Sequence, residues 1–230
     1  ITDYCRFHDL SLADKLHLFQ QVCSAVAHAH QKLVVHRDIK PNNILVNENG
    51  EAKLLDFGIA KIYSEAQQLT SDGMMVGTPA YMAPEQLKGQ AVDARTDIYS
   101  LGVVLYQALT GECPFVAETP LAVAMMHVHN PLRPPRQINP AIPEALERII
   151  FRAMAKNADD RFQTAGAMAQ ALRAAVASTP ATQSLALPES SAPAIAPPTP
   201  HTPLPAQETA AQPAIPPAPP TPVPAPAAPP

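Results

Sequence analysis

The chain has 230 residues, of which 28 are proline, and 18 of those prolines follow Ala177. Lys and Arg number 16 against 20 Asp and Glu, so binding of nucleic acid through bulk positive charge is not expected. Residues 177–230 contain no Phe, Tyr, Trp, Lys or Arg and consist mainly of Pro, Ala, Thr and Ser, a composition that cannot form a packed core. We therefore expect one folded domain, residues 1–176, and a disordered Pro/Ala-rich tail, residues 177–230.

The first clear element is a long helix predicted over residues 11–32. Ser11 and Asp14 have the spacing of a capping box, which marks a helix start. Apolar residues then recur at intervals of three and four from Leu12 to His30, giving one apolar face. A long, partly buried helix is expected.

A short hairpin and a series of helices follow. Residues 44–46 and 52–55 read as two strands, because Asn49-Gly50 between them supplies the positive φ angles of a tight turn. Residues 63–78 lose periodicity and gain Ser, Thr, Gln and Gly, which predicts a long loop. The remaining pattern predicts helices at 95–110, 119–129, 143–155 and 164–176.

Two polar clusters flank the predicted hairpin. The first is His36-Arg37-Asp38-Ile39-Lys40-Pro41-Asn42-Asn43, and the second is Asp56-Phe57-Gly58. A carboxylate, a cation and an amide on one loop suit the positioning of a hydroxyl and a metal ion near a transferable phosphate, and the hairpin returns a second carboxylate to the same edge. Further along come Gly77-Thr78-Pro79 and then Ala83-Pro84-Glu85.

In this order and spacing, the motifs resemble those of the eukaryotic-type protein kinases, H-R-D-x-K-x-x-N, D-F-G and A-P-E. The resemblance extends from Ile1 to about Ala177, and Lys40 with Gly77-Thr78 is typical of the serine/threonine branch, especially its bacterial members. It implies an α+β fold, the mainly helical large (C-terminal) lobe of a kinase with its small β-hairpin. The implied activity is ATP-dependent phosphorylation of serine and threonine hydroxyls on protein substrates.

The resemblance also implies a role for each motif residue. Asp38 would accept or orient the proton of the substrate hydroxyl, and Lys40 would contact ATP and neutralise the transferring phosphoryl group. Asn43 and Asp56 would hold the Mg²⁺ ions that bridge the ATP phosphates. Phosphoryl transfer depends mostly on positioning and charge stabilisation, which these four side chains can supply.

Regulatory and structural roles follow from the same resemblance. Arg37 would pair with a phosphorylated loop on which Thr70 and Ser71 are the candidate phosphosites. Thr78 would line the peptide-binding end of that loop and bond Asp38. The residues with implied structural roles, including a buried Glu85–Arg161 ion pair and Asp97 as the anchor of the Asp38 loop, are His36, Phe57, Gly58, Glu85, Asp97 and Arg161.

The sequence departs from a complete kinase at its start. No G-x-G-x-x-G motif occurs, and too few residues precede the long helix to build a small N-terminal lobe with its strand lysine and helix glutamate. We therefore expect the large lobe of a longer kinase, inactive alone. The alternative is a catalytically silent, kinase-like scaffold. Intact Asp38, Asn43 and Asp56 argue against it, because a scaffold is free to lose them.

Other side chains have simpler expected roles. Cys5, Cys23 and Cys113 are interpreted as core thiols in a reducing compartment, so the expected location is cytoplasmic, with a membrane anchor beyond Pro230 left open. The pairs His28/His30 and His127/His129 are interpreted as core or solvated rather than metal-binding, because helical positions i and i+2 face different directions. The tail is more typical of a spacer than of a partner-binding PxxP segment, with Pro216–Pro219 as the best candidate for the latter.

Overall fold

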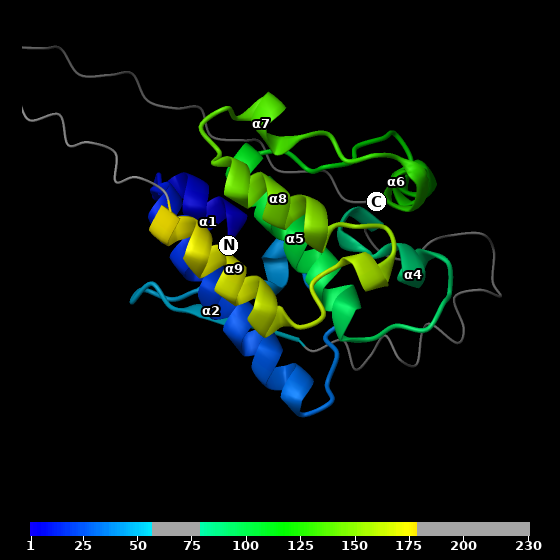
Figure 1. Cartoon of the computed structure of the whole chain (residues 1–230), viewed down its shortest axis with the longest axis horizontal. Helices are drawn as coiled ribbons and strands as arrows, with labels where there is room; N and C mark the ends of the chain where they lie inside the picture. The colour runs from blue at the N-terminus through cyan, green and yellow to red at the C-terminus, as the bar shows by residue number, and fades with distance from the viewer. Residues whose placement is uncertain (57–78, 179–230) are drawn as a thin grey trace, which may run out of the picture. The chain divides into compact units, whose positions relative to one another are not determined.

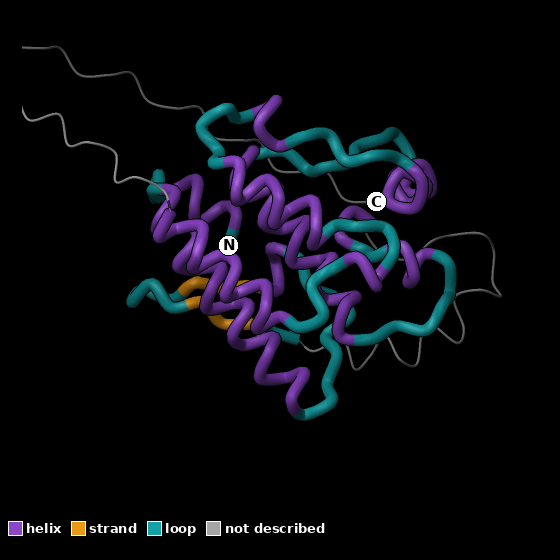
Figure 2. Tube along the Cα trace, in the orientation of Figure 1, coloured by secondary structure: helices purple, strands orange, loops and turns teal. Residues whose placement is uncertain are grey.

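The computed structural model describes residues 1–56 and 79–178. These residues form a mainly helical domain with one two-stranded antiparallel sheet (Figures 1 and 2). Its longer helices are α2 (Leu12–Gln31), α5 (Ala94–Thr110), α6 (Pro120–His129), α8 (Glu144–Ala153) and α9 (Ala165–Ser178). The sheet is β1 (Ile44–Val46) paired with β2 (Ala52–Leu54). The predictions of mainly helical structure and a single small hairpin are confirmed for the described part of the chain.

Short elements connect the long ones. They are α1 (Thr2–Phe7), η1 (Pro41–Asn43), η2 (Pro79–Tyr81), α4 (Pro84–Leu87), α7 (Pro135–Ile138) and η3 (Ala158–Asp160). Most of these begin with a proline at the first helical position, where the missing N–H costs nothing. Such one-turn helices are too short to leave a periodic sequence pattern, and the sequence did not predict α4 or α7.

Helix α2 begins as its sequence predicts. The Ser11 hydroxyl accepts a hydrogen bond from the Asp14 backbone N–H at 3.2 Å and donates to the Asp14 carboxylate at 2.6 Å. The helix buries the face that carries Leu16, Phe19 and Cys23. Helix α9 lies along α2, as Figure 1 shows, so the first and last long helices of the described domain pack side by side.

Helix α5 is the centre of the domain. All but four of its 17 residues are buried, and α8, α2 and α9 pack around it. Gly102 allows the closest approach, because an added Cβ would lie 2.8 Å from Met154 Cγ and 2.9 Å from Ala153 Cβ. A larger residue there would push α8 away from α5. The helix ends at Gly111, whose φ of +82° is the left-handed conformation common after a helix C-terminus.

Candidate functional site

The loop of residues 36–43, here called the Asp38 loop, brings three predicted site residues together. Lys40 Nζ lies 2.9 Å from Asp38 Oδ2, so the cation and the carboxylate form an ion pair. Asn43 Nδ2 donates to the Asp38 backbone oxygen at 2.8 Å and to Asp38 Oδ2 at 3.1 Å. Asn43 is held in place because Pro41–Asn43 form the one-turn helix η1 directly before β1. The Asp38 carboxylate is thereby oriented from two sides.

Helix α5 anchors the backbone of this loop through Asp97. Its Oδ2 accepts from the His36 N–H and its Oδ1 accepts from the Arg37 N–H, both at 2.8 Å. Arg37 has a φ of +64°, a left-handed conformation that costs a non-glycine residue about 1–3 kcal/mol. The two bonds to Asp97 help to hold that conformation. Asp97 therefore has the contacts that the resemblance implies.

His30 also contacts the Asp97 carboxylate, although the sequence indicated only a core or solvated histidine. Its Nε2 lies 2.8 Å from Asp97 Oδ2, so α2 and α5 meet at this carboxylate. Within residues 1–56 and 79–178, the buried Nδ1 of His30 has no hydrogen-bond partner. The pairing joins residues 67 positions apart. No local pattern could therefore have revealed it.

The hairpin carries Asp56 back to the Asp38 loop. The Leu55 N–H donates to the Asn43 backbone oxygen at 2.8 Å, and the buried His36 ring places Nε2 2.8 Å from the Leu55 oxygen. The next residue, Asp56, has a φ of +48° and an exposed side chain. The predicted return of Asp56 to the edge that carries Asn43 is thus present in the backbone.

Gln21 of α2 fixes the other end of the hairpin. Its Oε1 accepts from the Ala52 N–H at 2.8 Å, and its Nε2 donates to the Gly50 oxygen at 3.4 Å. Since Ala52 begins β2, this amide ties the strand that leads to Asp56 to the long helix. No local sequence pattern identifies Gln21, because its partners Gly50 and Ala52 lie 29 and 31 residues away.

The donor set fits a Mg²⁺ ion that also binds phosphate. Both printed bonds of the Asn43 amide use Nδ2, so the Oδ1 oxygen, which can ligate a cation, has no hydrogen bond to any residue the structure describes. Asp56 adds an exposed carboxylate. Across the two described ranges, no group of three or more His, Cys, Asp or Glu side chains could hold a metal alone. Mg²⁺ is commonly held by one or two such oxygens together with substrate phosphates, which agrees with this sparse set.

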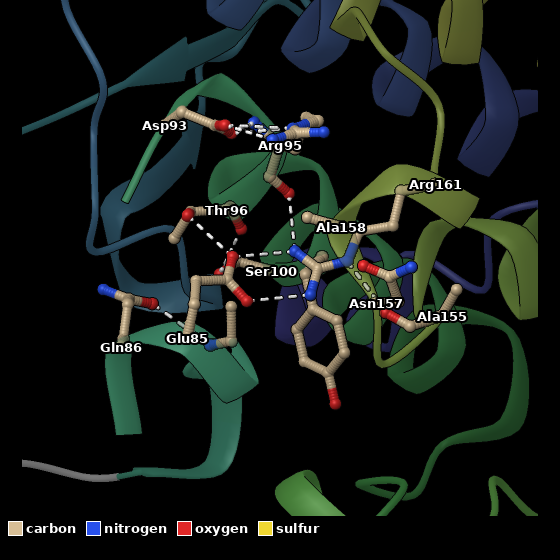
Figure 3. A network of polar contacts seen from close by, with 12 residues as sticks. Glu85, Gln86, Asp93, Arg95, Thr96, Ser100, Ala155, Asn157, Ala158 and Arg161 are labelled. Atoms are coloured by element: carbon tan, nitrogen blue, oxygen red, sulfur yellow. Dashed lines mark hydrogen bonds and ion pairs between the residues drawn. The ribbon is translucent and has the colours of Figure 1, made fainter. Parts of the chain in front are cut away.

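Glu85 of α4 and Arg161, which directly follows η3, form a bidentate ion pair (Figure 3). Arg161 Nη1 lies 2.8 Å from Glu85 Oε1, and Nη2 lies 2.8 Å from Oε2. Thr96 donates to the same Oε1 at 2.7 Å. Burial opposes ionisation of Glu85, but the hydrogen bonds and charge of Arg161 outweigh it and hold the pKa of Glu85 below its ordinary value. The predicted ion pair is present.

Several predicted residues cannot be placed. Phe57, Gly58, Thr70, Ser71 and Thr78 lie outside the described residues. The structure therefore does not test the proposed phosphosites or the Thr78–Asp38 contact. Arg37 is half-buried at the edge of the Asp38 loop.

Apart from His30, which contacts Asp97, the paired histidines lie as the sequence predicts. His28 and His129 are exposed, whereas His127 is fully buried beside Tyr99, whose hydroxyl lies 2.9 Å from His127 Nδ1. Burial, together with the nearby positive charge of Lys156, lowers the pKa of His127 to about 4. Such an imidazole is neutral at physiological pH and packs as a core residue. Cys5 and Cys23 are likewise buried, while Cys113 is half-buried.

Comparison with known proteins identifies the class. The sequence matches the protein kinase domain over residues 5–173, and the chain belongs to the protein kinase family. It is 48% identical over 164 residues to the serine/threonine-protein kinase Pkn1 of Myxococcus xanthus, an alignment that covers 70% of this chain and 24% of Pkn1.

Two further relatives are also bacterial serine/threonine-protein kinases. The DNA damage-responsive serine/threonine-protein kinase RqkA of Deinococcus radiodurans is 44% identical over 145 residues, covering 63% of this chain and 22% of RqkA. The serine/threonine-protein kinase PknB of Mycobacterium leprae is 40% identical over 153 residues, covering 66% of this chain and 25% of PknB. The chain therefore belongs to the bacterial serine/threonine branch of the protein kinase family, and it spans about a quarter of the length of these relatives. Among the helices that the structure describes, none has the length and apolar character needed to cross a membrane.

Proposed function

We propose that this chain supplies the large-lobe half of the active site of an ATP-dependent protein serine/threonine kinase. The observation that carries the proposal is the Asp38–Lys40–Asn43 cluster, with Asp56 returned to the same edge by a hydrogen-bonded hairpin. Family membership and the serine/threonine relatives support the reaction class. Retention of all four side chains favours an enzyme over a silent scaffold.

In this proposal Asp38 is the group that meets the substrate hydroxyl. Its carboxylate is fixed by Lys40 and Asn43, so one oxygen can receive or orient the hydroxyl proton as the serine or threonine oxygen attacks phosphorus. Lys40 would neutralise charge on the transferred group, a role supported by its position 2.9 Å from Asp38. Asn43 and Asp56 would hold Mg²⁺, which supplies charge neutralisation of the ATP phosphates when bound.

The test is kinetic and uses the natural polypeptide that carries this chain. Asp38→Asn is expected to lower kcat by about 10²–10⁴, the usual contribution of a positioned general base, with little change in the KM for ATP. Asp56→Asn is expected to weaken Mg²⁺-ATP binding instead. Near-wild-type turnover of the Asp38→Asn variant would overturn the assignment.

Regulation by phosphorylation is the second part of the proposal. A phosphate on Thr70 or Ser71 would meet the Arg37 guanidinium through charge-assisted hydrogen bonds and so order the loop. Activity should then rise with phosphorylation. Full activity of a Thr70→Ala/Ser71→Ala double variant would exclude this switch.

Domain limits and location complete the proposal. The folded unit is predicted over residues 1–176, although α9 continues to Ser178, and the remainder is a spacer, so the large-lobe function does not depend on the Pro/Ala-rich tail. The expected compartment is the cytoplasm, where the three thiols would stay reduced. Deletion of residues 179–230 should leave the cooperative unfolding transition of the domain unchanged, and a lowered transition midpoint would show that the tail is part of the fold.

A further inference from the structure

The side chain of Gln86 bridges two segments that are far apart in the sequence. Its Nε2 donates to the Arg37 backbone oxygen at 3.0 Å, across 49 residues of chain. Its Oε1 accepts from the Ala83 N–H at 3.1 Å. An amide is suited to this place because it carries a donor and an acceptor, one for each segment.

The Arg37 end of this bridge lies next to Asp38. The Arg37 carbonyl and the Asp38 N–H belong to one planar peptide unit. Gln86 holds the carbonyl of that unit, and His36 Nδ1, 3.3 Å from the Asp38 nitrogen, holds its N–H. The orientation of this plane sets the direction in which the Asp38 side chain leaves the backbone. Gln86 therefore influences the direction of the Asp38 carboxylate without contacting it.

The bridge also supports a strained residue. Arg37 is held at a φ of +64°, and Asp97 binds its N–H on the other side. A left-handed non-glycine residue persists only where its surroundings over-determine it. Gln86 supplies the contact on the carbonyl side, which Asp97 does not reach.

The other end of the bridge is firmly anchored. Gln86 and Glu85 are neighbours on the short helix α4, as Figure 3 shows. Glu85 is fixed by its two hydrogen bonds to Arg161 and by Thr96. The Gln86 amide thus joins the Asp38 loop to a segment that the buried Glu85–Arg161 ion pair holds in place.

We propose that Gln86 is a positioning residue for Asp38, which couples the orientation of the Arg37–Asp38 peptide to the anchored Ala83–Gln86 segment. The inference rests on the proposed role of Asp38 in phosphoryl transfer. Two substitutions distinguish the hydrogen bond to Arg37 from the hydrogen bond to Ala83. Gln86→Glu keeps an oxygen for the Ala83 N–H but replaces the donor to Arg37 with a second oxygen. Gln86→Leu removes both hydrogen bonds of the amide and replaces it with a side chain of similar size.

The first test follows amide hydrogen exchange, residue by residue, by NMR of the 230-residue chain, and needs no catalytic activity. In Gln86→Glu we expect faster exchange at Asp38 and retained protection at Ala83. In Gln86→Leu we expect faster exchange at both. Gln90→Glu, an exposed substitution on the same connection, controls for the added negative charge and should change neither amide. Unchanged exchange at Asp38 in both Gln86 variants would overturn the proposal.

The second test measures steady-state kinetics of the natural polypeptide that carries this chain. Misplacement of a reacting group can cost about 100-fold, so we expect Gln86→Glu to lower kcat by about 10- to 100-fold with the KM for ATP within about twofold of wild type. A kcat equal to that of Gln90→Glu, or a loss explained by a lowered folded fraction, would overturn the positioning role. If wild type itself transfers no phosphate, the proposed function fails, and the exchange result still decides whether Gln86 orients the loop.

Discussion

The Arg161 guanidinium meets the Glu85 carboxylate through two parallel hydrogen bonds, each 2.8 Å long, and neither side chain is more than 11% exposed. Arg161 also donates to the backbone oxygens of Ala155, Lys156 and Arg95. Removing one member of such a pair leaves a buried charge and several carbonyls without partners. The pair therefore joins α4, α5 and the segment before α9.

The first prediction concerns this pair. Arg161→Ala should lower the free energy of unfolding by about 3–5 kcal/mol, measured by urea denaturation, because it leaves the Glu85 charge uncompensated. Arg148→Ala provides a matched control, since Arg148 pairs with Glu144 at the surface and is 66% exposed. An exposed pair contributes about 0–1 kcal/mol. Equal losses in the two variants would contradict a special role for the buried pair.

The second prediction concerns the pH dependence of stability. The folded-state pKa of His127 is about 4, below the ordinary value of 6.5, so the unfolded chain binds more protons between these pH values. Stability from this residue is present above about pH 6.5 and is lost as pH falls toward 4, by about 2–3 kcal/mol. His127→Gln should flatten the slope of unfolding free energy against pH in this window. His129→Gln, on the exposed end of the same helix, should leave the slope unchanged.

The same measurement can also contradict the role of His127 in the pH dependence of stability. A wild-type slope that survives His127→Gln would assign the acid sensitivity to other groups. The charged and titratable neighbours around this imidazole are Lys156, whose Nζ donates to the His127 oxygen at 2.7 Å, and Tyr99. Lys156→Met would then test whether removal of the nearby cation raises the pKa of His127, followed by NMR titration of the ring.

Sequence patterns predicted the parts of this fold that depend on local chemistry. Ser11 and Asp14 predicted the start of α2, and Asn49-Gly50 predicted the hairpin, because caps and tight turns are set by neighbouring residues. Only Gly50, with a φ of +73°, has the positive angle that was expected of both turn residues. The motif spacing predicted the grouping of Asp38, Lys40 and Asn43 on one loop. It missed the contacts of His30 and Gln86. Their partners lie 67 and 49 residues away, where only tertiary packing brings them together.

The third prediction tests the anchor of the Asp38 loop. In Asp97→Asn a single oxygen replaces the two that accept from His36 and Arg37, and the NH₂ group then faces a backbone N–H. An unsatisfied buried donor costs about 1–3 kcal/mol, so we expect that loss in unfolding free energy and faster amide exchange at His36 or Arg37.

A control for Asp97 lies on the same helix. Asp93 caps α5 by accepting from the Arg95 N–H at 2.8 Å, and asparagine is an equally good N-cap. The variant keeps the cap but loses the half-exposed ion pair between Asp93 and the Arg95 side chain, so Asp93→Asn should change stability by no more than about 1 kcal/mol. An Asp97→Asn variant as stable as Asp93→Asn, with unchanged exchange, would remove Asp97 from the anchoring role.

The last prediction is that the 230-residue chain, tested alone, shows no measurable phosphoryl transfer. Its sequence has no G-x-G-x-x-G loop to cover the ATP phosphates, and Leu45, next to the Asp38 loop on β1, is 52% exposed instead of packed. Alignment of reacting groups can contribute up to about 7–11 kcal/mol, which Asp38, Asn43 and Asp56 cannot supply without a second wall for the nucleotide. The measurement is incubation with Mg²⁺, labelled ATP and a generic basic protein. Transfer above background that disappears in Asp38→Asn would show that the large lobe suffices, and that the missing wall is not required for catalysis.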